Sequence, residues 1–458
     1  MCCQPANASQ TSVLISDYLP EERIREHANC HHALTELQDL GTVETALIAG
    51  SSRVSNLLRK LLGTEPEIFV ERALIVTRAY AHTESEPFES RQGRAFADLL
   101  NEYPIVIRDG ELIVGSKVPS AFGSPVYPEI SFEWLEAELD TLSTRKEQPF
   151  RVSEEVKKTL REYVFPYWRG KTVNAELLRA LPKEVLDAHE AGVLFHYYLD
   201  RSIGHLVVDY EKVLRRGLNG IKKEVENELA CMKDRGESSP WKANLLESMV
   251  TCADATMAFA NRYALEAQRL ADREQDPRRR RELLDIAEIC RRVPGNPALT
   301  FWEAVQGFFF IHLVLNLESN AYAISPGRFD QYMYPYYKQD VESGRITKDF
   351  AGELLRCLWI KFNELTVAKS RGTAKQSTTY NDFQNLNLGG VGRDGKDAVN
   401  ELSYLLLKVA ADLKLPQPNL TALISSKSPQ DFLSRSIDVV ALGFGQPALI
   451  NDDMKIIE

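Results

Sequence analysis

The spacing of apolar residues along the chain predicts two regions that meet near residue 297. Between residues 19 and 297, apolar residues recur every three or four positions, which is the period of an amphipathic helix. Helices are predicted over 19–103, with a break at the polar stretch 84–89, and at Ser131–Leu142, Glu154–Tyr163, Lys183–Leu199, Tyr210–Asp234, Trp241–Glu274 and Arg281–Arg292. Pro294 and Pro297 end this region. Residues 1–18 are polar and are predicted to be a disordered tail.

Residues 298–458 follow a different pattern, in which each helix leads into a short extended segment. The predicted helices are Phe301–Leu317, Lys348–Leu365, Ala398–Leu413 and Asp431–Leu442, and the segments after them are Ala321–Ser325, Phe383–Gly390, Pro418–Ser425 and Pro447–Ile450. These alternations predict an α/β layer or barrel with the helices outside. The predicted fold class is therefore α/β with a large helical N-terminal part.

The segment Pro104–Gly115 predicts a β-hairpin. Apolar runs flank Asp109-Gly110, and Asp-Gly fits the type I′ turn that matches the twist of paired strands. Residues 116–130 are rich in proline, glycine and serine and are predicted to form a long ordered loop, a feature that is often functional.

Composition and charge exclude several classes of function. The 458 residues include 55 Lys and Arg and 65 Asp and Glu, and the formal net charge of −10 argues against a nucleic-acid partner. The basic run Arg278–Arg281 follows Asp276-Pro277 and is interpreted as the solvated start of a helix. No segment approaches the roughly 18 uncharged apolar residues of a membrane helix, so no membrane association is predicted.

Seven scattered cysteines without a CxxC pair indicate reduced thiols, and neither a disulfide framework nor a metal centre. No secretory signal is visible, so the predicted location is cytoplasmic. The sequence also has no P-loop, no dinucleotide-binding glycine fingerprint, no HExxH and no GxSxG. We therefore predict no directly bound cofactor and no metal site.

Polar residues gather where the predicted strands begin or end. Glu318–Asn320 close an apolar helix, Gln384-Asn385 and Gln417–Asn419 begin strands, and Asn451–Asp453 follow the last strand. In a barrel, polar residues at strand ends converge on the mouth, where ligands bind. The alternative is capping, because Asn, Asp and Gln also satisfy free backbone groups at such positions. The sequence leaves both interpretations equally open.

The segment Asp200–His205 is a second candidate for chemistry. Arg201 and His205 are four residues apart, so on a helix they would share a face. Arginine offers a forked cation suited to a carboxylate or sulfonate, and histidine transfers protons near neutral pH. Gly204 would let another backbone approach closely. Residue type alone favours the alternative, a surface pair at the end of a helix.

A series of motifs runs in order from about residue 20 to the end of the chain. They are Glu71-Arg-Ala, Arg108-Asp-Gly-Glu-Leu-Ile-Val-Gly115, Pro128-Glu-Ile-Ser-Phe-Glu-Trp134, Tyr167-Trp-Arg-Gly-Lys-Thr172, Tyr210–Gly220, Phe301-Trp-Glu-Ala-Val-Gln306, Glu318-Ser-Asn320, Ser325–Tyr332, Tyr334-Pro-Tyr336, Leu358–Glu364, Phe383-Gln-Asn385, Leu415–Asn419 and Asn451-Asp-Asp453. Together they resemble the pyruvate formate-lyase domain of glycyl radical enzymes, in the branch similar to glycerol dehydratase.

The resemblance implies half of a ten-stranded α/β barrel. Residues 19–458 would be a partial pyruvate formate-lyase-like domain, with 19–297 as a mainly helical wrap and 298–458 as the first half-barrel. In such enzymes a separate S-adenosylmethionine-dependent iron–sulfur activase installs a glycyl radical, which generates a thiyl radical on a cysteine. The thiyl takes a hydrogen atom from the substrate in a dry cavity, while a glutamate assists proton transfer. The resemblance also implies an anaerobic host and a homodimer.

The resemblance places these radical groups beyond Glu458. The thiyl cysteine, its glutamate and the radical glycine are then absent from the 458 residues, and Cys357 is expected to be a small core residue. We therefore expect this chain alone to be inactive. It would be a gene fragment, one half of a split enzyme, or a non-catalytic helper that complements a second chain or dimerises.

For substrate binding, the resemblance implies contacts from Arg201, His205, Tyr322, Phe383 and Gln384. The family's dehydratases carry His-Ser where this chain has Tyr322-Ala323, while an arginine four residues before His205 is similar to members that cleave sulfonates. Bidentate arginine suits an anion in a dry cavity. The expected substrate is a small hydroxylated molecule such as isethionate or dihydroxypropanesulfonate, with a diol or glycerol dehydratase or an arylacetate decarboxylase as alternatives.

Overall fold

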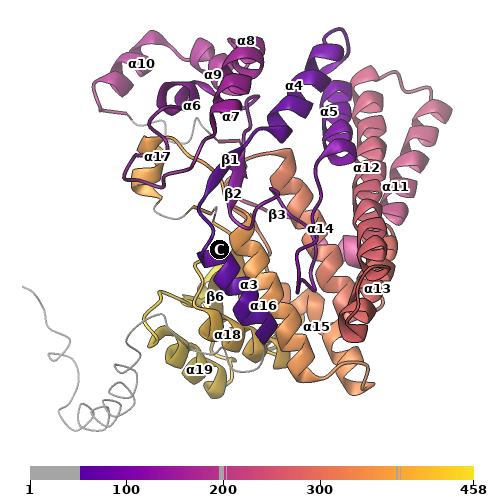
Figure 1. Ribbon diagram of the computed structural model, residues 1–458. Coiled ribbons are helices and arrows are strands. Elements are labelled where there is room, and N and C mark those ends of the chain that lie inside the picture. Colours follow the sequence, from indigo (N-terminus) through magenta and orange to yellow (C-terminus); the bar gives the residue numbers. More distant parts are fainter. Residues whose placement is uncertain (1–51, 195–200, 203, 378–379, 382, 458) are drawn as a thin grey trace, which may run out of the picture. The chain divides into compact units, whose positions relative to one another are not determined.

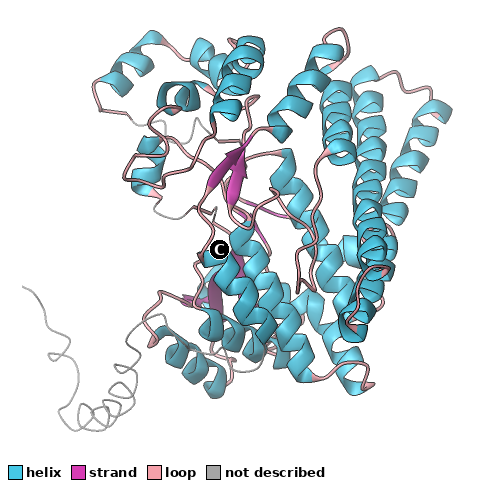
Figure 2. Ribbon diagram, viewed as in Figure 1, coloured by secondary structure: helices cyan, strands magenta, loops and turns pink. Residues whose placement is uncertain are grey.

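The computed structural model describes residues 52–194, 201–202, 204–377, 380–381 and 383–457, which lie within the compact unit Ser51–Glu458. The tail predicted at residues 1–18 lies outside the described residues, as do Cys2, Cys3 and Cys30. Within the described part, helices dominate and the strands are short (Figures 1 and 2).

The first part of this unit consists of helices and one pair of short strands. Its elements are α3 (Ser52–Leu62), β1 (Glu67–Phe69), α4 (Glu71–His82), α5 (Phe88–Glu102), β2 (Gly123–Pro125), α6 (Glu133–Glu138), α7 (Glu154–Thr159), the π-helical turn η3 (Leu160–Val164), α8 (Phe165–Trp168), α9 (Val173–Ala180) and α10 (Lys183–Glu190). Strands β1 and β2 pair in parallel. Apart from β2, residues 116–130 form the ordered loop that the sequence predicts, and most of its residues are buried.

Three long helices follow, α11 (Tyr210–Asp234), α12 (Pro240–Ala271) and α13 (Pro277–Arg292). Helix α12 packs against α5, α11 and α13, and Figure 1 shows these helices side by side. Helix α13 starts as predicted, because the Asp276 side chain accepts a hydrogen bond from the backbone N–H of Arg278. The prediction that the whole basic run is solvated is wrong for Arg279. That side chain is buried and donates to the carbonyl of Glu111 at 2.9 Å.

The remaining elements confirm the predicted alternation of helices and strands. They are β3 (Leu206–Val207), α14 (Phe301–Glu318), β4 (Ile324–Ser325), α15 (Phe329–Glu342), α16 (Lys348–Glu364), α17 (Arg371–Gln376), β5 (Asn385–Gly389), α18 (Glu401–Leu413), β6 (Asn419–Ile424), α19 (Gln430–Val440), β7 (Ala448–Asn451) and α20 (Asp452–Ile457). Strand β3 pairs in parallel with β4, and β5, β6 and β7 form a second parallel sheet. A parallel bridge between Gly327 and Leu386 links the two sheets.

Helix α14 lies at the centre of the core and is buried on nearly all sides, as expected for a helix that is apolar around its whole circumference. Its buried polar side chains have partners. The amide of Gln306 accepts from the N–H of Val114 and donates to the carbonyl of the same residue, both at 2.8 Å. The Gln306 side chain therefore forms the two backbone hydrogen bonds that a neighbouring strand would otherwise form with Val114.

The predicted hairpin at Pro104–Gly115 is wrong. The turn exists, since the N–H of Glu111 donates to the carbonyl of Arg108, but no strand forms on either side of it. Side chains of distant helices take the backbone groups that a hairpin would pair. Trp302 donates to the carbonyl of Leu112 at 3.0 Å, and Lys361 donates to that of Gly115 at 3.0 Å. The segment is therefore held as an extended loop in the core.

Four buried charges connect this loop to α16. Arg108 and Glu111 come from the loop, Lys361 and Glu364 from the last turn of the helix, and each side chain is at most 7% exposed. Arg108 lies 3.0 Å from both carboxylates, and Lys361 bonds both of them as well. Burial opposes ionisation of Glu111, but Lys361 and Arg108 hold its pKa below the usual value. Two motifs that are 250 residues apart in sequence thus form one ion cluster.

Arg72 fixes the end of α14 in a similar way. Its buried guanidinium donates to the carbonyls of Leu317 and Glu318, both at 2.6 Å, and forms an ion pair with Glu129. A cation at the carboxyl end of a helix satisfies free carbonyls and interacts favourably with the helix dipole. The Glu318–Asn320 turn, which leads into β4, is therefore held in place by α4.

Asp330, at the start of α15, ties the end of β5 to α18. Its carboxylate accepts from the N–H of Gly389 at 2.8 Å and from the hydroxyl of Ser403 at 2.5 Å. The residue is fully buried, and burial raises its pKa to about 6 from a usual 3.8. Because the folded state disfavours ionisation, the contribution of Asp330 to stability is fully present below pH 3.8 and is lost as the pH rises through 6.

We expect Asp330→Asn to remove this pH dependence. As the pH falls from 7 to 4, wild type should gain about 2.4 kcal/mol in free energy of unfolding relative to the variant, because the asparagine does not titrate. Denaturant unfolding of both proteins across this pH range measures the difference between their free energies of unfolding. The contributions of the other titrating groups are the same in both proteins and cancel in this difference. A difference that is independent of pH would show that the carboxyl ionises normally.

Candidate functional site

The predicted substrate residues Arg201, His205 and Tyr322 lie together where β3 meets β4. The N–H of His205 donates to the carbonyl of Tyr322 at 2.6 Å, and the N–H of Leu206 donates to that of Ala323 at 3.2 Å. The ring centroids of His205 and Tyr322 are 5.5 Å apart. Both His205 and Ala323 have positive φ angles, of 58° and 60°, which L-residues rarely adopt. The contact between the two segments is thus strongly constrained.

Gly204 makes this close approach possible, as its residue type predicts. A Cβ atom at this position would lie 1.7 Å from the carbonyl oxygen of Tyr322. No side chain fits there, so glycine is the residue that lets the two backbones meet.

Arg201 and His205 do not share a helix. Helix α10 ends at Glu190, and the described residues from 201 to 207 are irregular or extended, while Asp200 and Ile203 lie outside the described residues. Arg201 is buried, its Nη1 donates to the carbonyl of Asn320 at 3.3 Å, and its guanidinium carbon lies 5.8 Å from the centre of the Tyr322 ring. His205 is exposed. The alternative of a surface pair therefore does not describe Arg201.

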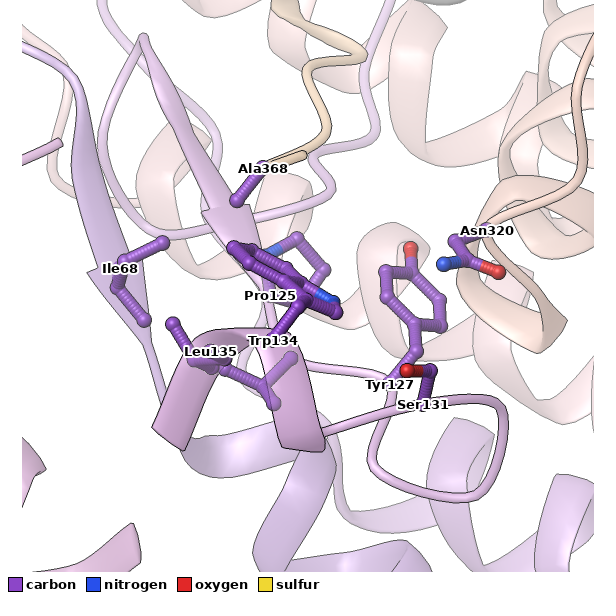
Figure 3. Close-up of a pocket in the computed structure, with 9 residues that line it drawn as sticks. Ile68, Pro125, Tyr127, Ser131, Trp134, Leu135, Asn320 and Ala368 are labelled. Atoms are coloured by element: carbon purple, nitrogen blue, oxygen red, sulfur yellow. The ribbon is translucent and has the colours of Figure 1, made fainter. Parts of the chain in front are cut away.

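The turn at Asn320 supports this arrangement. Its side-chain oxygen accepts from the N–H of Ser202 at 3.0 Å, so Asn320 holds the segment next to Arg201. Asn320 also lines a cavity of about 10 Å³ together with Ile68, Pro125, Val126, Tyr127, Ser131, Trp134, Leu135 and Ala368 (Figure 3). That volume is close to the minimum for one water molecule and is too small for an organic substrate. This cavity therefore borders the candidate site and is not the substrate chamber.

Phe383 and Gln384 stand at the start of β5. The ring of Phe383 is exposed, whereas Gln384 is buried and its amide is bound within the protein. Gln384 Nε2 donates to the carbonyl of Phe362 at 3.1 Å, and its backbone N–H donates to the side chain of Gln417 at 2.9 Å. A substrate contact from either residue stays a prediction.

The sequence did not reveal a buried network that begins at Gln384. His312, inside α14, places Nε2 2.7 Å from Gln384 Oε1 and Nδ1 2.8 Å from the hydroxyl of Tyr210. Because the amide nitrogen of Gln384 binds Phe362, its oxygen faces His312, and Nε2 must donate the proton. Nδ1 then accepts from Tyr210. Burial lowers the pKa of His312 to about 4, so the ring is neutral at pH 7.

Several polar residues at the strand ends serve the backbone, as the capping alternative predicts. Gln446 accepts from the N–H of Leu420 at 3.2 Å, as Gln417 accepts from Gln384. Asp452 accepts from the N–H of Val391 at 2.8 Å, and Asp453 accepts from that of Ser426 at 2.7 Å. The Asn451–Asp453 motif therefore fastens the loops that follow β5 and β6.

One face of the β5–β6 sheet remains polar. The Asn385 side chain donates to Asn387 at 2.9 Å and accepts from the hydroxyl of Thr421 at 2.8 Å, whereas Leu386 and Leu388 on the opposite face are fully buried. A parallel sheet usually has apolar faces on both sides. This sheet therefore departs from that pattern on the face that carries Asn385 and Asn387.

The cysteines of the described part give no sign of a reactive thiol in this region. Cys357 is buried in α16, as the sequence predicts for a core residue, and burial raises its pKa to about 12. Among the described residues, His, Cys, Asp and Glu side chains form no group of three suited to a metal ion. In the same part of the chain, no helix combines the length and apolar character needed to cross a membrane.

Comparison with known proteins identifies the family. The model of the pyruvate formate lyase-like family matches residues 45–458. The chain is 36% identical to trans-4-hydroxy-L-proline dehydratase of Clostridioides difficile over 89% of this chain and 52% of that enzyme. It is also 36% identical to isethionate sulfite-lyase of Desulfovibrio desulfuricans, over 88% of this chain and 50% of that enzyme.

The solved structures agree. The B12-independent glycerol dehydratase from Clostridium butyricum superimposes with a TM-score of 0.85 and 40% identity, over 89% of this chain and 51% of that one. The chain thus belongs to the pyruvate formate lyase-like family, whose relatives here are glycyl radical enzymes. It spans about half the length of the curated relatives it matches. The predicted α/β fold of part of a glycyl radical enzyme barrel is confirmed.

Proposed function

We propose that this chain is the N-terminal portion of an anaerobic glycyl radical lyase that cleaves a C–X bond of a small hydroxylated, anionic substrate. The observation that carries the anionic part is the buried guanidinium of Arg201, held beside Tyr322 on the segment that leads to His205. The planar, forked guanidinium matches the geometry of a carboxylate or sulfonate, and in a buried position it binds such an anion strongly.

The relatives support this choice. Hydroxyproline carries a carboxylate and isethionate a sulfonate, and each also has a hydroxyl group. A hydroxyalkyl sulfonate such as isethionate or dihydroxypropanesulfonate fits the same description. The similarity to glycerol dehydratase favours a second candidate, dehydration of a neutral diol or glycerol. An anionic substrate needs a cation such as Arg201 in the site, whereas a neutral diol or glycerol does not.

The site residues then have distinct roles. Arg201 pairs with the anionic group, His205 binds the substrate hydroxyl and exchanges protons there, and Tyr322 and Phe383 supply ring surfaces that shield the substrate from water. The amide of Gln384 is already bound, so it acts on the substrate by fixing the start of β5. In the complete enzyme, a glycyl radical installed by a separate S-adenosylmethionine-dependent activase would generate the thiyl radical that abstracts the hydrogen atom.

Replacing Arg201 tests the anionic substrate. In the complete activated enzyme, we expect Arg201→Gln to lower kcat/KM for isethionate or hydroxyproline by about 100-fold, because the paired charge is lost. Turnover of glycerol should be much less affected. Arg201→Lys, which keeps the charge but not the fork, serves as the matched control and should retain part of the activity. Faster turnover of glycerol than of any anion by wild type would favour the dehydratase candidate.

We further propose that the radical chemistry requires polypeptide beyond these 458 residues, in a cytoplasmic homodimer. Incubation of the purified chain with the activase and S-adenosylmethionine should give no glycyl radical signal in electron paramagnetic resonance. A clear signal would refute this part of the proposal. If activity appears only when a second polypeptide is added, the chain is one half of a split enzyme. If adding that polypeptide has no effect, the result favours a non-catalytic chain that only dimerises.

A further inference from the structure

The network of Tyr210, His312 and Gln384 connects two segments that line the proposed site. Tyr210 is the first residue of α11, which is separated from the end of β3 by two residues, so it is five residues from His205. Gln384 adjoins Phe383 and precedes β5. His312 lies between them on α14, which is buried on nearly all sides, and both of its ring nitrogens form hydrogen bonds.

Burial makes this connection rigid. Tyr210, His312 and Gln384 are each at most 1% exposed, so water does not compete for their hydrogen bonds. The ring of Tyr210 lies 4.5 Å from that of Phe308, and the ring of His312 lies 5.3 Å from that of Phe362. Aromatic packing thus restricts the rotamers, and removal of one polar atom leaves a buried group without its partner.

The network also has a fixed direction. Tyr210 donates to Nδ1, Nε2 donates to Gln384, and Gln384 donates to the carbonyl of Phe362. Each donor therefore has one acceptor. The His312 ring cannot change its tautomer while Gln384 keeps its hydrogen bond to Phe362 in α16. Such a chain transmits a displacement at one end to the other.

We propose that His312, acting through Tyr210 and Gln384, is a positioning residue that sets the distance between the His205 segment and the Phe383 segment and so determines substrate affinity. This inference rests on the proposed function. It assigns a role to residues that bind no substrate atom themselves. Misplacing a binding segment by about 1 Å is enough to reduce catalysis by up to two orders of magnitude.

Tyr210→Phe removes the hydroxyl and leaves the ring. In the complete activated enzyme we expect kcat/KM to fall roughly tenfold, mainly through KM, because the substrate-binding segments lose their fixed spacing. His312→Leu should reproduce this loss. His312→Gln should recover most of it, because glutamine can donate to Gln384 and accept from Tyr210 as the imidazole does.

Tyr103→Phe is the matched control. Tyr103 is fully buried and its hydroxyl donates a single hydrogen bond, to the carbonyl of Lys117 at 2.6 Å. This change removes the same atom and should lower the unfolding temperature to a similar degree while leaving KM unchanged. Equal effects of both tyrosine variants on KM would show that the network has only a structural role and would overturn the proposal.

Hydrogen exchange gives a readout that does not depend on the substrate. Tyr210→Phe should accelerate amide exchange in residues 204–209 and in residues 383–389 together, whereas Tyr103→Phe should leave both segments unchanged. The wild-type enzyme could turn over none of the proposed substrates while amide exchange in both segments still rises in Tyr210→Phe. The proposed substrate would then be wrong, but the coupling between the two segments would be supported. If only residues 204–209 respond to Tyr210→Phe, the coupling is refuted even in an active enzyme.

Discussion

Lys361→Met is expected to lower the free energy of unfolding by about 3–5 kcal/mol, the largest loss of stability among the changes considered. The substitution leaves Arg108 as the sole cation beside two buried carboxylates, Glu111 and Glu364. Both carboxylates are buried, so water compensates little of the excess negative charge. Denaturant unfolding monitored by circular dichroism measures the change.

Two further variants give this prediction its controls. Lys183→Met breaks an exposed ion pair with Asp187 and should leave stability nearly unchanged. The double variant Glu111→Gln/Lys361→Met restores charge balance to the cluster, since Arg108 and Glu364 remain 3.0 Å apart. It should therefore be more stable than Lys361→Met alone. Additive losses in the double variant would mean that the four charges do not act as one cluster.

The same cluster shows what a single sequence leaves undetermined. The helices around Lys361 follow from local periodicity, and the alternation of α16, β5, α18 and β6 follows from periodicity and turn residues, so all of these are predictable. The Asp109-Gly110 turn is equally local. Its flanking backbone groups, however, bind Trp302 and Lys361, which are about 190 and 250 residues away in the chain. Local propensity for a hairpin is overruled by these tertiary contacts.

In the candidate site too, some residues can be predicted from the sequence and others cannot. Arg201 and His205 can be found in the sequence because an arginine and a histidine close to a glycine are unusual in a short segment. The sequence does not show that Arg201 is buried and His205 exposed. His312 lies in a run of apolar residues, where a lone histidine gives no signal of its partners. Its hydrogen bonds reach Tyr210 and Gln384, 102 and 72 residues away. Only a structure brings these three together.

Gly204→Ala is expected to have the largest effect on function. The new Cβ would lie 1.7 Å from the carbonyl oxygen of Tyr322 and 2.5 Å from its backbone nitrogen, so β3 would have to move away from β4. The hydrogen bond from His205 to Tyr322 would then be lost, and with it the placement of Arg201 and His205 against the Tyr322 ring. We expect kcat/KM of the complete enzyme to fall by about 100-fold or more.

The control for this change is Gly372→Ala in α17, where the nearest neighbouring atom is 4.0 Å from the new Cβ and the backbone is not strained. That variant should keep wild-type activity and unfolding temperature. Gly192→Ala meets no atom within 4 Å but has a φ of 71°, so it measures the cost of backbone strain without a clash. If Gly204→Ala behaves like Gly192→Ala in both measurements, the two backbones can separate without harm. The close contact between β3 and Tyr322 would then not determine the geometry of the site. Substrate recognition would have to depend on other residues, such as those on the polar face of the β5–β6 sheet.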